Sequence, residues 1–312
     1  MEKRARYFKE GNQMRWMLSV CLLLNFGFTK PLVMALQDRV VDAVVIVAIE
    51  KKFFEEQGVD IAPKRFTSGP ATSEALIFGD ADIATMGDTA GLIAISKYCP
   101  KIQILTALGG GEKRHGIVVA NDSNVSSLSS LIGKKIAVKK GTSTHGGVML
   151  KAKAEGINLD KEMMDLEPSL MASALMAKEV DAVIASEPTP SVLIEKGIGK
   201  RIMTLDGVGN TYPLLLMVKE ASFKAHASQM SGVFKALEKA AQFINEHPDE
   251  SAQIVSKFSK LSVSASKEAM AYHFYKIGID ETTKTSLMKM AEFLYDNKKL
   301  SALPDLEKCT AH

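Results

Sequence analysis

Short apolar runs alternate with segments of helical character along the chain from residue 30 onward. The apolar runs predict β-strands at residues 31–36, 59–66, 81–86 and 101–108. The segments between the runs predict helices at residues 42–57, 71–78 and 89–98. This alternation is typical of βαβ units in a mostly parallel sheet, so we expect a protein of the α/β class.

The alternation stops at Gly109–Gly111 and then starts again. The second part predicts strands at residues 116–120, 135–139, 180–185 and 213–218, and helices at residues 144–155, 170–178, 222–246 and 283–300. At roughly 100–200 residues per domain, a chain of 312 residues suits two lobes. We expect one lobe to contain residues 30–113 and 218–312, the other to contain residues 114–217, and residues 1–28 to form a separate signal segment.

One stretch of sequence occurs in two versions. Residues 74–88 align without gaps with residues 173–187, and each version ends an apolar strand with a carboxylate, Asp88 or Glu187. The match either reflects what any two helix–strand units share or marks equivalent units in two lobes, and we favour the second interpretation. Because ligands of open α/β sheets bind at the strand ends, equivalent units predict a crevice shared by the lobes.

The amino-terminal segment predicts export. Residues 1–16 hold five basic and two acidic side chains, which account for the whole net charge of +3. The remainder is neutral, so the basic footprint of a nucleic-acid-binding protein is missing. Residues 17–28 are mostly apolar and uncharged, and their helical length of about 18 Å is too short to span a membrane core of about 30 Å. This pattern is typical of a secretory signal, with an uncleaved anchor as the alternative.

Catalytic and metal-binding motifs are missing from the sequence. There is no G-x-S-x-G elbow, no phosphate-binding glycine loop and no H-E-x-x-H pair. Cys99 and Cys309 could form one disulfide in an oxidising compartment, but they do not have zinc-site spacing. We therefore expect a protein that is not an enzyme and that needs neither metal nor cofactor.

Two predicted helix starts could bind an anion. One follows Gly141 and carries Thr142, Ser143 and Thr144, and the other carries Ser68, Gly69 and Thr72. A helix N-terminus offers unpaired N–H groups and about half a positive charge, so two of them would bind an anion without a full positive charge. The alternative is that these hydroxyls only cap their helices.

Other polar residues near the predicted strand ends are further candidates. Gln37 can donate and accept hydrogen bonds, and Arg39 could hold an anion in a bidentate pair or be an ordinary solvated charge. Asp88 and Glu187 would repel a bare anion and favour a ligand with an amine, unless they only stabilise their helix starts. His145 is either a binding residue or a structural hydrogen-bonding partner.

Several ordered segments resemble one family. They are Ala48–Phe54 with Gly58-Val59-Asp60, Ser68-Gly69-Pro70 with Gly87-Asp88, Lys140–His145, and Val180-Asp181-Ala182 with Glu187-Pro188. Together they resemble the periplasmic substrate-binding proteins of ABC importers for aliphatic sulfonates, taurine, nitrate and thiamine precursors, and sulfonate binders most closely. Sulfonate binders often carry an aromatic residue where this chain has Ser186, so the resemblance leaves the choice of ligand open.

The resemblance implies a fold, a function and partners. It implies the two-lobed type II periplasmic binding protein fold, with a ligand cleft between the lobes in which Gln37 contacts the ligand. The expected function is capture of a small organic anion, above all a sulfonate, and its delivery to the membrane permease of an ABC importer. We expect an extracytoplasmic monomer. The alternative is an enzyme of the same fold, or a binder of thiamine-pyrimidine precursors, although the Cys-rich signature of such enzymes is missing.

Overall fold

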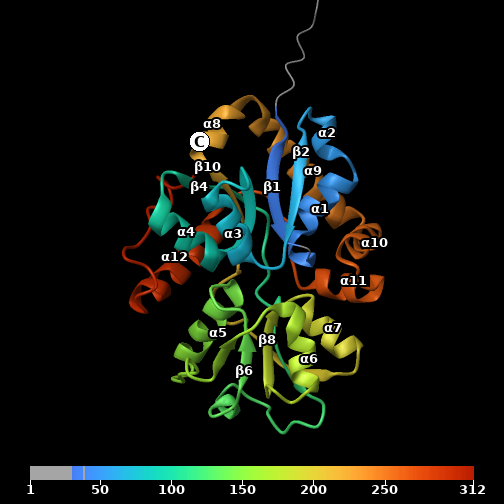
Figure 1. Ribbon diagram of the computed structural model, residues 1–312, viewed down its shortest axis with the longest axis vertical. Helices are drawn as coiled ribbons and strands as arrows, with labels where there is room; N and C mark the ends of the chain where they lie inside the picture. The colour runs from blue at the N-terminus through green and yellow to red at the C-terminus, as the bar shows by residue number, and fades with distance from the viewer. Residues whose placement is uncertain (1–29, 38) are drawn as a thin grey trace, which may run out of the picture. The chain divides into compact units, whose positions relative to one another are not determined.

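The computed structural model describes residues 30–37 and 39–312, and residues 31–312 form one compact unit built on two five-stranded sheets (Figure 1). The first sheet has the order β2 (Ile61–Phe66), β1 (Leu32–Gln37), β3 (Ile83–Gly87), β10 (Leu214–Lys219) and β4 (Ile102–Ala107). The second has the order β7 (Met163–Asp165), β6 (Ile136–Val138), β8 (Ala182–Ser186), β5 (His115–Ala120) and β9 (Gly199–Thr204). We call the elements around them the first and the second lobe. The expected α/β class is confirmed.

The two sheets follow the same plan. In each, the first three strands of the order are parallel, and the fourth is antiparallel to both of its neighbours. β3 and β8, which end the two versions of the repeated stretch, hold the same third position. The repeat therefore corresponds to equivalent units of the two sheets.

The sheets are mostly parallel as expected, since only β10 in the first and β5 in the second run against their neighbours. One sequence expectation needs correction. The expected lobe boundary at residue 217 falls inside β10, which belongs entirely to the first sheet. The chain therefore crosses between the sheets twice, through residues 108–114 and 205–213, and each crossing leads directly into an antiparallel strand.

Helices cover both faces of the first sheet. One apolar core packs β1 and β10 against α1 (Ala43–Glu50), α2 (Phe53–Glu56), α9 (Ala227–Glu246), α10 (Pro248–Ser259) and α11 (Val263–Ala271). The expected single helix at 42–57 is divided because Lys52 has a left-handed backbone, with φ of 62°. The short α8 (Glu220–Ala225) follows β10.

A second core is shared by the two lobes. On the opposite face of the first sheet lie α3 (Gly69–Phe78), α4 (Asp88–Tyr98) and α12 (Glu281–Asp296), whose apolar residues form one cluster with side chains of the second lobe. α12 contacts both α4 and α5 (Ser143–Ala154). α6 (Met171–Met176) and α7 (Thr189–Glu195) complete the second lobe. Figure 1 shows α5 on one side of the second sheet, with α6 and α7 on the other.

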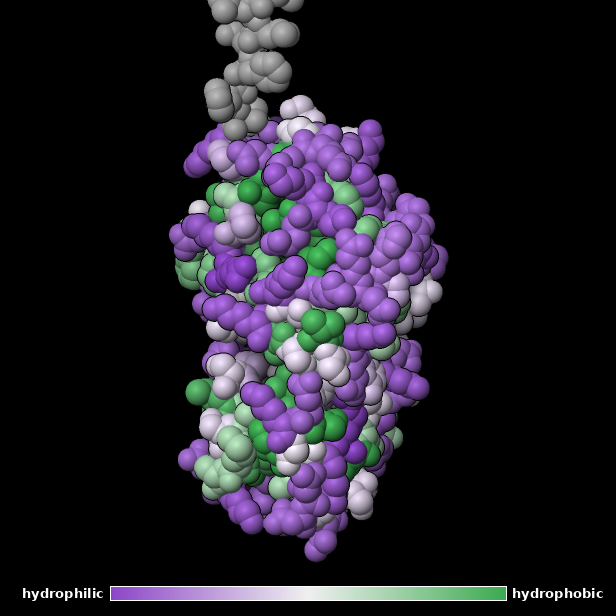
Figure 2. Space-filling model, turned by 90° about the vertical axis from the view of Figure 1, so that its right-hand side faces the viewer, coloured by the Kyte–Doolittle hydropathy of each residue, from purple (hydrophilic) through white to green (hydrophobic). Residues whose placement is uncertain are grey.

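A disulfide joins Cys99, directly after α4, to Cys309 near the end of the chain, with a Cα–Cα distance of 5.7 Å. Hydrophilic side chains cover most of the face seen in Figure 2, with scattered hydrophobic residues between them. Among residues 30–37 and 39–312, none of the helices combines the length and the apolar character that crossing a bilayer requires. The predicted signal segment, residues 1–28, lies outside the described residues.

Candidate functional site

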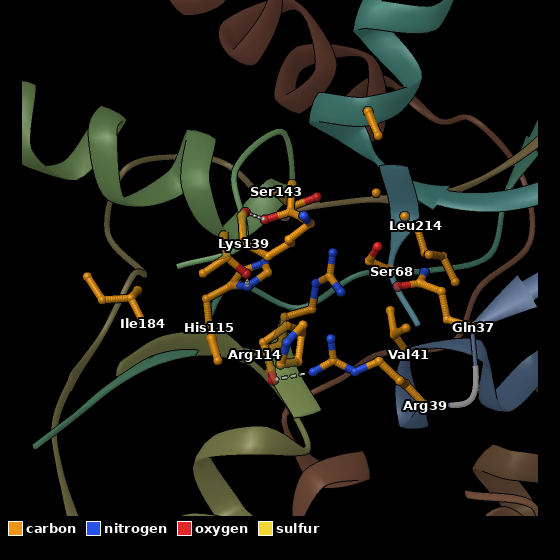
Figure 3. A pocket seen from close by; sticks show the side chains of 18 of the residues that line it. Gln37, Arg39, Val41, Ser68, Arg114, His115, Lys139, Ser143, Ile184 and Leu214 are labelled. Atoms are coloured by element: carbon orange, nitrogen blue, oxygen red, sulfur yellow. Dashed lines mark hydrogen bonds between the residues drawn. The ribbon is translucent and has the colours of Figure 1, made fainter. Parts of the chain in front are cut away.

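A small cavity lies between the two lobes (Figure 3). The first lobe contributes Gln37, Arg39, Ser68, Gly69 and Gly87, and the second contributes Lys139, Thr142, Ser143, Thr144 and Ser186. Arg114 and His115 enter where the first crossing segment meets β5. The remaining lining is apolar: Val41, Ala90, Pro168, Met171, Ile184, Ala185 and Leu214. The cavity volume is about 50 Å³.

Helix starts from both lobes meet at this cavity. Ser68 precedes α3 and makes no side-chain capping bond, so its hydroxyl is not used in starting the helix. Ser143 is the first residue of α5, and its buried Oγ has no hydrogen-bond partner among the described residues. Thr142 caps α5 by accepting from the N–H of His145 at 3.3 Å. Two hydroxyls and two sets of helix-start N–H groups are therefore available at one place.

Arg114 is the most buried cation of the cavity. Its side chain is only 3% exposed, and its Nε has no partner among the described residues. Burial lowers the pKa of Arg114 to about 10, so the guanidinium is charged at neutral pH. Figure 3 shows it pointing into the space between the lobes. Burying a cation without a hydrogen-bonded carboxylate costs desolvation free energy, and an anion bound in the cavity would offset that cost.

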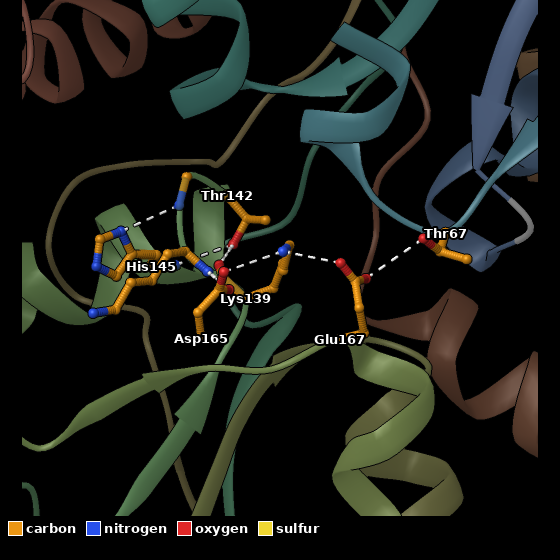
Figure 4. A network of polar contacts seen from close by, with 8 residues as sticks. Thr67, Lys139, Thr142, His145, Asp165 and Glu167 are labelled. Atoms are coloured by element: carbon orange, nitrogen blue, oxygen red, sulfur yellow. Dashed lines mark hydrogen bonds and ion pairs between the residues drawn. The ribbon is translucent and has the colours of Figure 1, made fainter. Parts of the chain in front are cut away.

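Arg39 and Lys139 are further cations of the lining. Arg39 donates from Nη2 to the carbonyl oxygen of Ser186 and to Oγ1 of Thr189, both at 3.0 Å. Burial lowers its pKa to about 10. Lys139 pairs with Glu167 at 2.9 Å and Asp165 at 3.3 Å (Figure 4), and the bond to Glu167 raises its pKa. The expectation of a site without full positive charges is therefore wrong.

His115 contributes a neutral polar group. Its Nδ1 shares a hydrogen bond of 2.8 Å with Oγ1 of Thr144, and Tyr212 packs edge-on against the ring. Burial lowers the pKa of His115 well below its ordinary value, so the ring is uncharged at neutral pH. Its Nε2 has no partner among the described residues. The contact with Thr144 joins β5 to the start of α5.

Two of the predicted ligand-binding residues, Thr72 and His145, form hydrogen bonds with the backbone and do not line the cavity. Thr72 is fully buried, and its Oγ1–H is shared between the carbonyl oxygens of Gly69 and Thr85, which lie 2.8 and 2.6 Å from Oγ1. His145 accepts from the N–H of Gly141 at 3.4 Å and so closes the turn before α5 (Figure 4). Burial lowers the pKa of His145. Neither side chain is part of the cavity lining.

The two repeat carboxylates, Asp88 and Glu187, are bound by other polar groups of the protein. Asp88 accepts from the N–H of Thr89 at 2.6 Å and from Asn210 at 3.0 Å. Glu187 pairs with Arg201 at 2.5 Å and accepts from the N–H of Ser191 at 3.2 Å. Neither residue belongs to the cavity lining, which contains no carboxylate among the described residues. The expected repulsion of a bare anion is therefore absent from this lining.

Another carboxylate lies beneath the lining. Asp42 is fully buried, and its Oδ2 accepts from the backbone N–H of Gln37 at 2.5 Å. Burial raises the pKa of Asp42 to about 7, while the nearby Arg114 and Arg39 act in the opposite direction. This residue stabilises the backbone that presents Gln37 and reduces the repulsion between the two arginines. Sequence reasoning missed it, since an Asp before a helix is an ordinary start signal.

We predict that Gly87→Ala weakens ligand binding about tenfold. A Cβ at this position would overlap Oγ of Ser143 and lie 3.2 Å from its Cβ, so the two lobes could not approach as closely. The φ of Gly87 is −72°, which alanine adopts freely, so stability should change little. Titration calorimetry checks the affinity. In a Ser143→Gly background the same change should have no further effect, and an equal loss in both backgrounds would contradict the steric explanation.

Comparison with known proteins agrees with this architecture. Residues 41–251 match the family model described as NMT1/THI5 like. The taurine-binding periplasmic protein of Escherichia coli K12 is 27% identical over 227 residues, which cover 70% of this chain and 68% of that protein.

Solved structures show the same fold. The alkanesulfonate-binding protein of Xanthomonas axonopodis pv. citri bound to MOPS has a TM-score of 0.81 at 20% identity, covering 90% of this chain and 98% of that one. The periplasmic aliphatic sulphonate binding protein of E. coli has a TM-score of 0.78 at 18% identity, covering 90% and 92%. The expected periplasmic binding protein fold is thereby confirmed, and the chain belongs to the NMT1/THI5-like family.

Proposed function

We propose that the protein is the solute-binding receptor of an ABC importer, which captures a small sulfonate-like anion between its lobes and delivers it to a membrane permease. The main support for the proposal is that Arg114 and Ser143 both line this cavity. A buried guanidinium and a buried hydroxyl, both without hydrogen-bonded partners among the described residues, lie in the lining of one cavity. Groups of this kind are the complement of a desolvated oxyanion.

The charge of the lining supports a monovalent anion. Glu167 and Asp165 offset the charge of Lys139, whereas Asp42 lies near both arginines and is partly protonated at neutral pH. The net charge around the cavity is therefore modestly positive, and the N-termini of α3 and α5 add partial positive charges to it.

The relatives support binding rather than turnover. The E. coli relative is named as a taurine-binding protein, and the structural neighbours are named as alkanesulfonate and aliphatic sulphonate binding proteins. We propose that this chain likewise binds without chemistry and acts as a monomer. Residues 1–28 would direct it across the cytoplasmic membrane, either as a removed signal or as an anchor, and the permease would receive the solute there.

Calorimetry against a panel of anions tests the proposal. The panel contains ethanesulfonate, taurine, MOPS, nitrate, acetate and a thiamine-pyrimidine precursor. We expect a sulfonate to bind best, and Ser143→Ala to weaken its binding about 10- to 150-fold, because one hydrogen bond to a charged group is lost. The thermal stability of the empty protein should stay nearly unchanged, since Ser143 Oγ has no hydrogen-bond partner among the described residues.

The control is Ser301→Ala, which removes an exposed hydroxyl outside the cavity and should leave the affinity unchanged. Preferred binding of the pyrimidine precursor, or its conversion to a product, would favour the alternative of a thiamine-related binder or enzyme. Binding of only neutral or cationic compounds would contradict the proposal.

A further inference from the structure

Arg39 contacts both lobes at the cavity. It follows β1 of the first lobe, and its Nη2 donates to Ser186 at the end of β8 and to Thr189 at the start of α7, both in the second lobe. Both N–H groups of Nη2 thus bind across the gap, and Figure 3 shows one of these two hydrogen bonds of Arg39. The nearby carboxylate of Glu187 favours the cation at this place.

The rest of the Arg39 guanidinium remains available. Arginine has five N–H donors in one rigid plane, and the groups on Nε and Nη1 make no hydrogen bond to the described residues. Arg39 also belongs to the cavity lining, together with Arg114. The two guanidinium groups repel each other, which lowers the pKa of Arg114 further, and an anion between them would remove that repulsion.

Two other hydrogen bonds between the lobes lack this double role. Thr67 donates to Glu167 at 3.5 Å, and Ser262 donates to Glu195 at 2.6 Å. Both are exposed hydrogen bonds, and none of these four residues belongs to the cavity lining. Exposed contacts of this kind contribute little and would form equally well without a ligand. Arg39 instead connects the lining with the second lobe through one rigid group.

We propose that Arg39 couples anion binding to lobe closure, with Nη2 holding Ser186 and Thr189 while Nε and Nη1 bind the anion. An anion bound to Nε and Nη1 orients the guanidinium so that Nη2 can donate to Ser186 and Thr189 of the second lobe. Closure of the lobes in turn holds the guanidinium in the orientation that binds the anion. The inference rests on the proposed function. It also assigns a positioning role to Thr189, which lies outside the cavity lining.

Thr189→Val isolates the contact across the gap. It keeps the shape of the side chain but removes the acceptor for Nη2, whereas the control Thr189→Ser keeps the hydroxyl. With ethanesulfonate as the probe, we expect Thr189→Val to raise Kd about tenfold and Thr189→Ser to stay near the wild-type value. In small-angle X-ray scattering at saturating ethanesulfonate, Thr189→Val should show a larger radius of gyration than the wild type.

A double-mutant cycle separates coupling from a purely structural effect. In an Arg39→Gln background, Thr189→Val should no longer change Kd, because its donor is gone. An undiminished effect in that background, or a wild-type Kd and scattering curve for Thr189→Val, would overturn the inference alone. If the wild type bound no anion of the panel, the proposed function would fail and the coupling to anions with it.

Discussion

Arg114→Gln is expected to weaken anion binding by roughly 100- to 10,000-fold. The guanidinium presents two parallel N–H donors and a full charge to the cavity, and each hydrogen bond to a charged group is worth about 1.5–3 kcal/mol. Glutamine keeps a polar side chain of shorter reach but removes the charge. Because every 1.4 kcal/mol changes Kd tenfold, the loss of two bonds produces the expected range. Titration calorimetry with ethanesulfonate measures the change.

Lys113→Gln is the matched control for this substitution. It removes the same charge one residue away, on an exposed side chain, and should leave Kd unchanged. Arg114→Lys should give an intermediate affinity, because the charge remains while the planar fork is lost. Thermal unfolding checks that each variant is folded. A Kd for Arg114→Gln within threefold of the wild type would rule out Arg114 as an anion ligand.

Removal of the disulfide is expected to destabilise the fold by about 4 kcal/mol. The bond joins residues 210 positions apart, and closing so long a loop restricts the unfolded chain strongly. The change is Cys99→Ser combined with Cys309→Ser, and the free energy of unfolding is measured by denaturant titration. Reduction of the wild-type protein should give a similar loss.

Cys21→Ser, measured on the full chain with residues 1–28 retained, provides the control for the disulfide, since it removes a thiol other than those of Cys99 and Cys309. It should leave the unfolding midpoint unchanged in the presence and absence of a reducing agent. Equal stability of the oxidised wild type and the double variant would contradict the expected stabilisation.

The order of strands and helices was largely predictable, because apolar periodicity reflects burial. The pattern could not predict local backbone conformation or the pairing of strands that are short or charged. Lys51-Lys52 suits a helix interior, yet Lys52 adopts a left-handed backbone and separates α1 from α2. β7 has only three residues, and β9 contains Lys200 and Arg201, so neither resembles an apolar run. Their place in the sheet depends on pairing with strands distant in the sequence.

The candidate site was predictable where it depends on a local turn. Ser68 and Ser143 lie in the lining because a helix begins there, and a helix start can be recognised from neighbouring residues. Arg114 follows Glu112 and Lys113 and so resembled an ordinary solvated charge. It is buried only because the crossing segment passes between the two sheets, which no local pattern reveals. Its position, directly before an apolar strand and after Gly109–Gly111, was the one feature of the sequence that could have indicated that Arg114 belongs to the site.

The placement of β5 and β10 affects how the lobes can move against each other. Each strand directly continues a crossing segment and is hydrogen-bonded on both flanks. A force on a crossing segment is therefore resisted by the backbone hydrogen bonds on both sides of β5 or β10. A strand at the edge of a sheet would be held by hydrogen bonds on one side only. Rotation of one lobe against the other must also change the packing of the core that the lobes share, because α12 contacts both α4 and α5 and Tyr212 of the second crossing is fully buried in that core. We therefore expect each sheet to move as a unit, with the cavity lining of each lobe intact, while the shared core rearranges as the gap opens.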